Sequence, residues 1–160
     1  LNHKISIMEN VQFHHYKDFL GELTVTYKRT QKLTPNITNS KDLDTFIRPY
    51  FEECMDSHEE MRIIHLNNAN YILNVHHHSK GGTAGTVADA KLILQQALLL
   101  KATGIVIIHN HPSGTLKPSL ADMNLTAKLK TGCEILDLRL LDSMIITRET
   151  YYSFMDEGVL

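Results

Sequence analysis

Two histidines, a serine and an aspartate lie close together in the second half of the chain, as His109, His111, Ser119 and Asp122. One residue separates the histidines, so on an extended strand both imidazoles project to the same side. Two imidazoles and one carboxylate leave the fourth position of a tetrahedral zinc ion open, as catalytic sites require. Such an ion lowers the pKa of a bound water to about 7. The pattern therefore predicts a metal-dependent hydrolase in which Ser119 stabilises an oxyanion and another segment supplies the general base.

The surrounding sequence predicts the elements that hold these groups. Residues 104–108 form an apolar, β-branched run that is typical of a buried strand ending where the histidines begin. Pro112 and Gly114 then turn the chain. Ser119 is placed as the N-cap of a helix with Asp122 three positions later, so Asp122 should face back toward the strand end.

Each half of this pattern also has an ordinary explanation. A Ser-x-x-Asp pair at a helix start is a common capping pair, and paired histidines on a strand are often surface residues. Their combination at the end of an apolar strand favours a metal site. Iron held by two histidines and one carboxylate is an alternative to zinc.

The spacing of these residues resembles the JAMM motif of MPN-type metalloproteases. Residues 109–114, followed by Pro118, Ser119 and Asp122, are similar to the RadC family, a bacterial branch of that superfamily. The resemblance covers at least residues 59–160 and, more loosely, 23–28. Further segments with counterparts in RadC-like chains are 81–83, 97–102, 136–142 and 151–158.

The resemblance implies an α/β fold of the cytidine-deaminase-like JAMM/MPN type, with a central mixed sheet flanked by helices. It implies that His109, His111 and Asp122 bind Zn²⁺ and that Ser119 polarises or stabilises the substrate oxygen. The implied function is a zinc-dependent metallohydrolase, resembling a metallopeptidase, that cleaves amide or isopeptide bonds.

In the same superfamily a glutamate at the start of an early strand acts as general base. Residues 61–66 match that strand, and Glu60 is the best match for the base, with Glu59 as the alternative. Because successive strand side chains point to opposite faces, the two glutamates cannot both face the metal.

One departure from the family pattern concerns Ser143. RadC-like chains usually carry Asp-His where this chain has Asp142 and Ser143. If the missing histidine binds substrate or orients a ligand, an inactive zinc domain that serves as an interaction scaffold is an alternative function.

Length and charge bound the partners. With 160 residues, 42% of them hydrophobic, the chain is expected to form one compact domain over residues 38–160, with residues 1–37 as an N-terminal arm and strand packing on it. The 16 basic and 18 acidic residues give no overall cationic field, which favours a protein or peptide substrate over DNA. The naming of RadC-like proteins as DNA repair factors keeps a nucleic-acid module of DNA repair or of a mobile element as an alternative. No helix-hairpin-helix signal is seen, so the chain resembles the short form of the family.

Cysteine usage and hydropathy bear on the compartment. Cys54 and Cys133 have no metal-ligand spacing and make no disulfide framework. No signal peptide or membrane-spanning run is visible, so a cytoplasmic protein without membrane partners is expected. The oligomeric state is not indicated.

Further elements complete the framework. His76, His77 and His78 are expected to be exposed, and a flexible segment at 80–85 is expected to border the active site. Asn39 or Ser40 should cap a helix that Pro49 disturbs. Other expected elements are strands at 23–27, 71–75 and 138–141 and a helix at 89–100.

Overall fold

The computed structural model describes residues 10–17, 22–28, 35–81 and 88–160. The chain divides into two units, Leu1–Thr34 and Pro35–Leu160. In the first unit, β1 (Asn10–Lys17) pairs antiparallel with β2 (Glu22–Lys28), which confirms the strand predicted at 23–27. Residues 82–85 of the predicted flexible segment lie outside the described residues.

The second unit begins at residue 35 rather than at the expected residue 38. The backbone of Pro35 and Ile37 is hydrogen-bonded to Ile72 and Asn70, and Asn36 forms a β-bridge with Tyr71. These contacts join residues 35–37 to the second unit.

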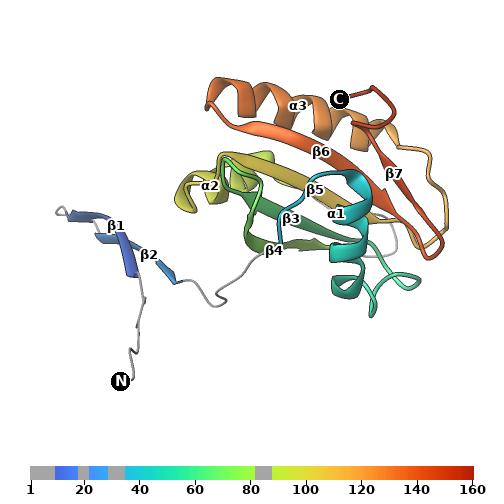
Figure 1. The fold of residues 1–160 in the computed structure, drawn as a ribbon, viewed down its shortest axis with the longest axis horizontal. Helices are drawn as coiled ribbons and strands as arrows, with labels where there is room; N and C mark the ends of the chain where they lie inside the picture. Colours follow the sequence, from blue (N-terminus) through green and yellow to red (C-terminus); the bar gives the residue numbers. More distant parts are fainter. Residues whose placement is uncertain (1–9, 18–21, 29–34, 82–87) are drawn as a thin grey trace, which may run out of the picture. The chain divides into compact units, whose positions relative to one another are not determined.

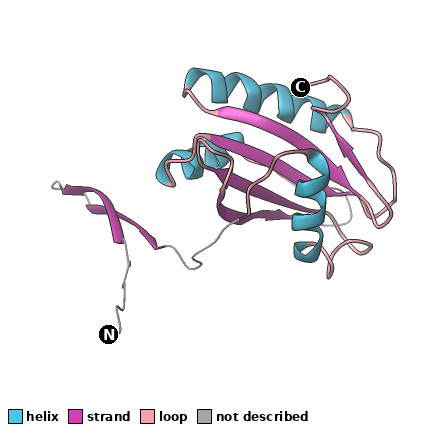
Figure 2. Cartoon of the chain, viewed as in Figure 1, coloured by secondary structure: helices cyan, strands magenta, loops and turns pink. Residues whose placement is uncertain are grey.

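The described part of the second unit contains a five-stranded mixed sheet in the order β4-β3-β5-β6-β7 (Figures 1 and 2). β5 and β6 are parallel, and the other neighbouring pairs are antiparallel. This arrangement confirms the predicted mixed α/β fold. The strands are β3 (Glu60–Leu66), β4 (Ile72–Lys80), β5 (Gly104–Asn110), β6 (Arg139–Ile146) and β7 (Tyr151–Ser153).

Helices cover both faces of the sheet (Figure 1). α1 (Ser40–Ile47) packs on one face, and α2 (Ala90–Leu99) and α3 (Leu120–Ile135) pack on the other. Asn39 caps α1 as predicted, and Pro49 lies in the short 3-10 helix η1 (Arg48–Tyr50) that follows it.

Strand alternation divides the core in two. Ile108 and Ile64 point toward α1, whereas Ile107 and Ile63 point toward α2 and α3. All residues of β5 are buried, because it is flanked by strands on both sides and covered on both faces. The register of the sheet therefore determines the direction of a side chain at the end of β5.

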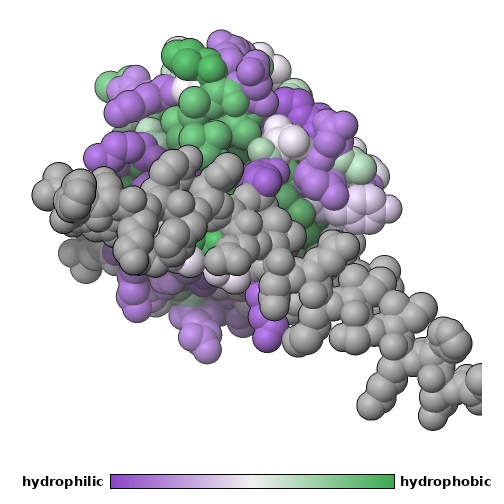
Figure 3. Space-filling view, turned by 90° about the vertical axis from the view of Figure 1, so that its left-hand side faces the viewer, coloured by the Kyte–Doolittle hydropathy of each residue, from purple (hydrophilic) through white to green (hydrophobic). Residues whose placement is uncertain are grey.

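An apolar groove of 830 Å³ lies between α2 and α3. Gly132 brings the helices together here, since a Cβ atom at this position would lie 2.6 Å from Leu94 Cδ1. Figure 3 shows a hydrophobic surface on this side of the molecule, and Leu98, Leu99 and Ile135 are exposed apolar residues of the groove. None of the described helices is both long and apolar enough to cross a membrane.

Candidate metal centre

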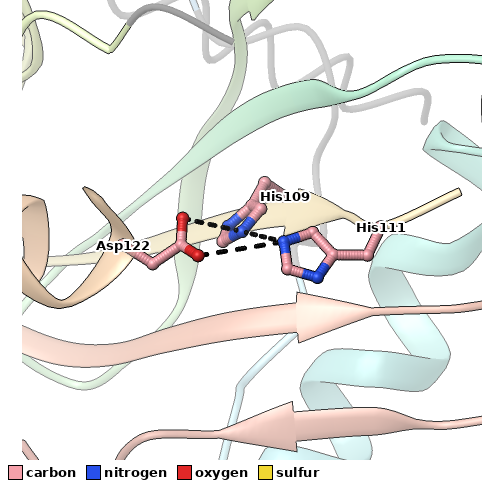
Figure 4. Close-up of side chains that lie close together, drawn as sticks. All are labelled: His109, His111 and Asp122. Atoms are coloured by element: carbon pink, nitrogen blue, oxygen red, sulfur yellow. Dashed lines mark hydrogen bonds and ion pairs between the residues drawn. The ribbon is translucent and has the colours of Figure 1, made fainter. Parts of the chain in front are cut away.

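The structure brings the two histidines and the aspartate together. His109 Nε2 lies 3.0 Å from His111 Nε2 and 3.2 Å from Asp122 Oδ1, and His111 Nε2 lies 3.8 Å from Asp122 Oδ2. Figure 4 shows the carboxylate facing both imidazoles. Among the described residues, these three side chains form the group that could hold a metal ion. Their ligand atoms all lie within 4.8 Å of one another.

These distances fit a tetrahedral zinc site. Bonds from Zn²⁺ to nitrogen or oxygen of about 2.0 Å imply ligand atoms about 3.3 Å apart. The distances from His109 Nε2 to His111 Nε2 and to Asp122 Oδ1, 3.0 and 3.2 Å, lie close to this value. His111 Nε2 lies 3.8 Å from the other carboxylate oxygen, Oδ2. Two imidazoles and one carboxylate also match a catalytic donor set, which leaves a fourth position for solvent or substrate.

His111 is held in the tautomer that a metal requires. Its Nδ1 lies 2.7 Å from the backbone oxygen of Thr115, so Nδ1 donates its proton there and leaves the Nε2 lone pair free. His109 is buried, and its Nδ1 has no hydrogen-bond partner among the described residues. Sequence analysis did not find Thr115, because a backbone carbonyl leaves no signal in the residue type.

Asp122 is fixed by the start of α3. The Ser119 hydroxyl accepts from the backbone nitrogen of Asp122 at 3.2 Å, while Asp122 Oδ2 accepts from the Ser119 backbone nitrogen at 2.7 Å and hydroxyl at 2.6 Å. This is the predicted capping box. Burial acts to raise the pKa of Asp122, but hydrogen bonds from His109 and Ser119 outweigh it and hold that pKa well below its usual range. Asp122 is therefore an anion ready to bind a cation.

The structure does not bring Glu60 to this group. β3 pairs with β5 so that Met61 lies opposite His109, which places Glu60 on the other face of the sheet. There its carboxylate contacts His58 at 3.0 Å and His77 at 3.2 Å, and Arg62 at 2.8 Å. The expectation that Glu60 faces the metal therefore differs from the observed geometry, and the register of β3 against β5 is the reason.

The electrostatics of Glu60 also disfavour a general base. Burial acts to raise its pKa, but hydrogen bonding from His58 and the charges of His77 and Arg62 lower it below the usual value. A general base works best when its pKa lies near the working pH. A lowered pKa moves Glu60 further from that range.

The RadC-like JAB domain family matches residues 37–159 of the chain. The chain belongs to this family. It is 48% identical over 123 residues to the UPF0758 protein of Flavobacterium johnsoniae, an alignment that covers 77% of this chain and 53% of that protein.

More distant UPF0758 proteins match the same region. The identity is 37% over 126 residues for Porphyromonas gingivalis, covering 78% of this chain and 55% of that protein. It is 36% over 125 residues for Aquifex aeolicus, covering 78% and 53%. The chain thus spans about half the length of these relatives, and their names state no activity.

Ser143, where RadC-like chains usually carry a histidine, lies beneath α3. It pairs with Ile107 of β5, and its buried hydroxyl accepts from Thr126 at 2.9 Å. Thr126 is one helical turn beyond Asp122 on α3. The departure therefore lies in the buried layer beneath α3, and the three candidate ligand side chains are still brought together.

Proposed function

We propose that this RadC-like JAB domain is a zinc-dependent hydrolase that cleaves amide or isopeptide bonds in proteins or peptides. The observation that carries the proposal is the convergence of His109 Nε2, His111 Nε2 and the Asp122 carboxylate. A Zn²⁺ ion held by these groups supplies a Lewis acid and lowers the pKa of a water molecule to about 7.

Glu59 is the general base in this proposal. Glu59 immediately precedes β3, and we extend the alternation of that strand by one residue, which gives Glu59 the same side as Met61, the residue opposite His109 in the sheet. Glu59 lies beside the strand ladder, because its backbone oxygen accepts from Gly81 at 2.8 Å. It takes a proton from the attacking water and delivers it to the leaving amine.

Ser119 has two tasks. In the structure its hydroxyl donates to Asp122 Oδ2 at 2.6 Å and so keeps the metal-binding carboxylate in place. During the reaction this hydroxyl turns toward the substrate oxygen, where it stabilises the developing negative charge.

Charge and cysteine chemistry support the choice of substrate and compartment. The balance of 16 basic and 18 acidic residues provides no cationic field for a polyanion, so we propose a polypeptide substrate rather than DNA. Cys54 and Cys133 are free and buried, and burial raises the pKa of each thiol to about 11. Free thiols fit the reducing cytoplasm.

The test combines metal analysis with hydrolysis of a panel of peptide and isopeptide substrates. Protein purified without added metal should contain one equivalent of zinc, and Asp122→Ala should lose both zinc and activity. Glu59→Gln should retain zinc and lose about 10²–10⁴-fold in rate, the usual contribution of a general base.

Glu60→Gln is the matched control, because it removes the same charge from the neighbouring residue on the other face. It should retain both zinc and rate. Full activity in Asp122→Ala would contradict the proposal of a metal-dependent hydrolase. One equivalent of redox-active iron in the purified protein would contradict the assignment of zinc as the metal. Loss of rate in Glu60→Gln but not in Glu59→Gln would reverse the assignment of the base.

A further inference from the structure

Asn110 stands between the two metal-binding histidines and faces away from them. Its side chain is fully buried, with an exposed fraction of 0%. Strand alternation directs it toward the α1 face of the sheet, whereas His109 points toward α3. A polar amide buried in this way must find hydrogen-bond partners, and those partners show what it holds.

The amide of Asn110 is hydrogen-bonded to four backbone groups within residues 54–60. Its Oδ1 accepts from the backbone nitrogen of Glu60 at 2.8 Å. Its Nδ2 donates to the backbone oxygens of His58 at 2.9 Å, Cys54 at 3.1 Å and Met55 at 3.2 Å. Asn110 therefore ties the end of β5 to the start of β3 and to the turn that precedes it.

This tie lies where a strand would otherwise fray. β5 ends at Asn110, and the next backbone contact is the hydrogen bond from the His111 nitrogen to the Ile146 oxygen at 2.9 Å. The separation of the two imidazoles depends on the backbone angles of residues 109–111, since each ligand is one residue from Asn110. A metal centre requires its ligands to be held within a few tenths of an ångström.

We propose that Asn110 is a positioning residue of the metal centre: its amide clamps the β5 end to residues 54–60 and thereby fixes the distance between His109 and His111. This inference rests on the metal site of the proposed function and adds a role for a residue that touches neither ion nor substrate. Outer residues that orient ligands typically change metal affinity 10–100-fold. The same clamp holds the backbone at the start of β3, next to Glu59.

The test measures metal binding separately from folding. Asn110→Ala removes all four hydrogen bonds. Asn110→Ser retains a short hydroxyl and can be measured in its place if the alanine variant does not fold. Zinc affinity is measured by competition with a chelator, coordination geometry by the visible absorption of bound Co²⁺, and folding by thermal denaturation of metal-free protein. All measurements are made at a temperature where the variants are folded.

Asp142→Asn is the matched control. Asp142 is also buried and accepts from Ser153 Oγ at 2.6 Å and from the backbone nitrogens of Ser143 and Met155 at 2.8 and 3.1 Å. It thus ties β6 to the segment after β7 without contacting the three ligands. The control should lower thermal stability and leave zinc affinity and the Co²⁺ spectrum unchanged.

The expected result is zinc affinity about 10–100-fold weaker, with an altered Co²⁺ spectrum, in the variants of Asn110 alone. Wild-type affinity and an unchanged spectrum in these variants would overturn the positioning role while leaving the metal site intact. An equal loss of affinity in Asp142→Asn would also overturn it, because general destabilisation would then be the cause. Failure of the wild-type protein to bind zinc would instead contradict the proposed function.

Discussion

Two clusters of the same residue types lie on opposite faces of the sheet, where β3 begins and the antiparallel β5 ends. One contains His109, His111 and Asp122, and the other contains His58, His77 and Glu60. Each has two imidazoles around one carboxylate. Only the first brings three ligand atoms within 4.8 Å of one another among the described residues.

The second cluster already contains its cation. The Arg62 guanidinium donates to Glu60 Oε2 at 2.8 Å and lies 5.0 Å above the ring of Phe51. A guanidinium is always charged and forms a fixed fork, so it neutralises the carboxylate permanently. The comparison shows that composition alone does not define a metal site. The carboxylate must also be free of an ion pair with an arginine or lysine side chain.

The largest expected difference between the clusters is in metal affinity. His109→Ala should weaken zinc binding by more than about 100-fold, because loss of a ligand has a larger effect than loss of a residue that only orients a ligand. His77→Ala should leave the affinity for the single tightly bound zinc ion unchanged. Titration with a chelator of known affinity measures both, and equal losses would erase the distinction between the clusters.

The next prediction tests whether the ion pair with Arg62 stabilises the Glu60 carboxylate. Arg62→Met should destabilise the protein by about 3 kcal/mol at pH 7, because a largely buried carboxylate loses its permanent partner. Glu60→Gln added to this variant should recover part of the loss. Urea denaturation of the two single variants and the double variant measures the coupling. A coupling energy near zero would show that the pair behaves as an exposed salt bridge.

A smaller effect on stability concerns His65, whose pKa is not affected by any neighbouring carboxylate. His65 is fully buried in β3, where burial and the neighbouring His76 lower its pKa to about 4 from 6.5. The unfolded chain therefore binds a proton before the folded chain does, and stability present above pH 6.5 is lost as the pH falls toward 4. The loss from this residue should reach about 2 kcal/mol at pH 5.

His65→Phe should flatten that part of the pH profile, measured by urea denaturation between pH 8 and pH 5. The pKa values of His76 and His78 are also lowered by burial, so their smaller contributions remain in both proteins. An unchanged slope in His65→Phe would mean that His65 is protonated in the folded state.

Local signals predicted the elements that bring His109, His111 and Asp122 together. Ser119 and Asp122 form the capping box that their spacing indicates, and the apolar run before His109 is a buried strand. Both depend on residues that are neighbours in sequence, where capping and alternation decide the outcome. Asn39 and Pro49 defined the start and the disturbance of α1 in the same way.

The direction of Glu60 needed information that is not local. Alternation shows that Glu59 and Glu60 face opposite sides, but only the pairing of Met61 with His109 decides which side holds the metal ligands. The histidine run was also misjudged in part, since His76 and His78 are half-buried against Gln96 and Asp89. β1 and β7 were not predicted as strands, because their pairing depends on partners elsewhere in the chain.

The capping box at the start of α3 has a consequence for how the proposed metal ion would bind and leave. Asp122 Oδ2 accepts from Ser119 and lies 3.8 Å from His111 Nε2, while Asp122 Oδ1 lies 3.2 Å from His109 Nε2. One carboxylate therefore caps the helix and also faces both imidazoles. The capping hydrogen bonds join Ser119 and Asp122 to each other, so we expect the helix start not to depend on an ion. Chelation and reloading should then be reversible exchanges on a folded scaffold, unlike those of a zinc finger, whose chain unfolds when its metal is removed.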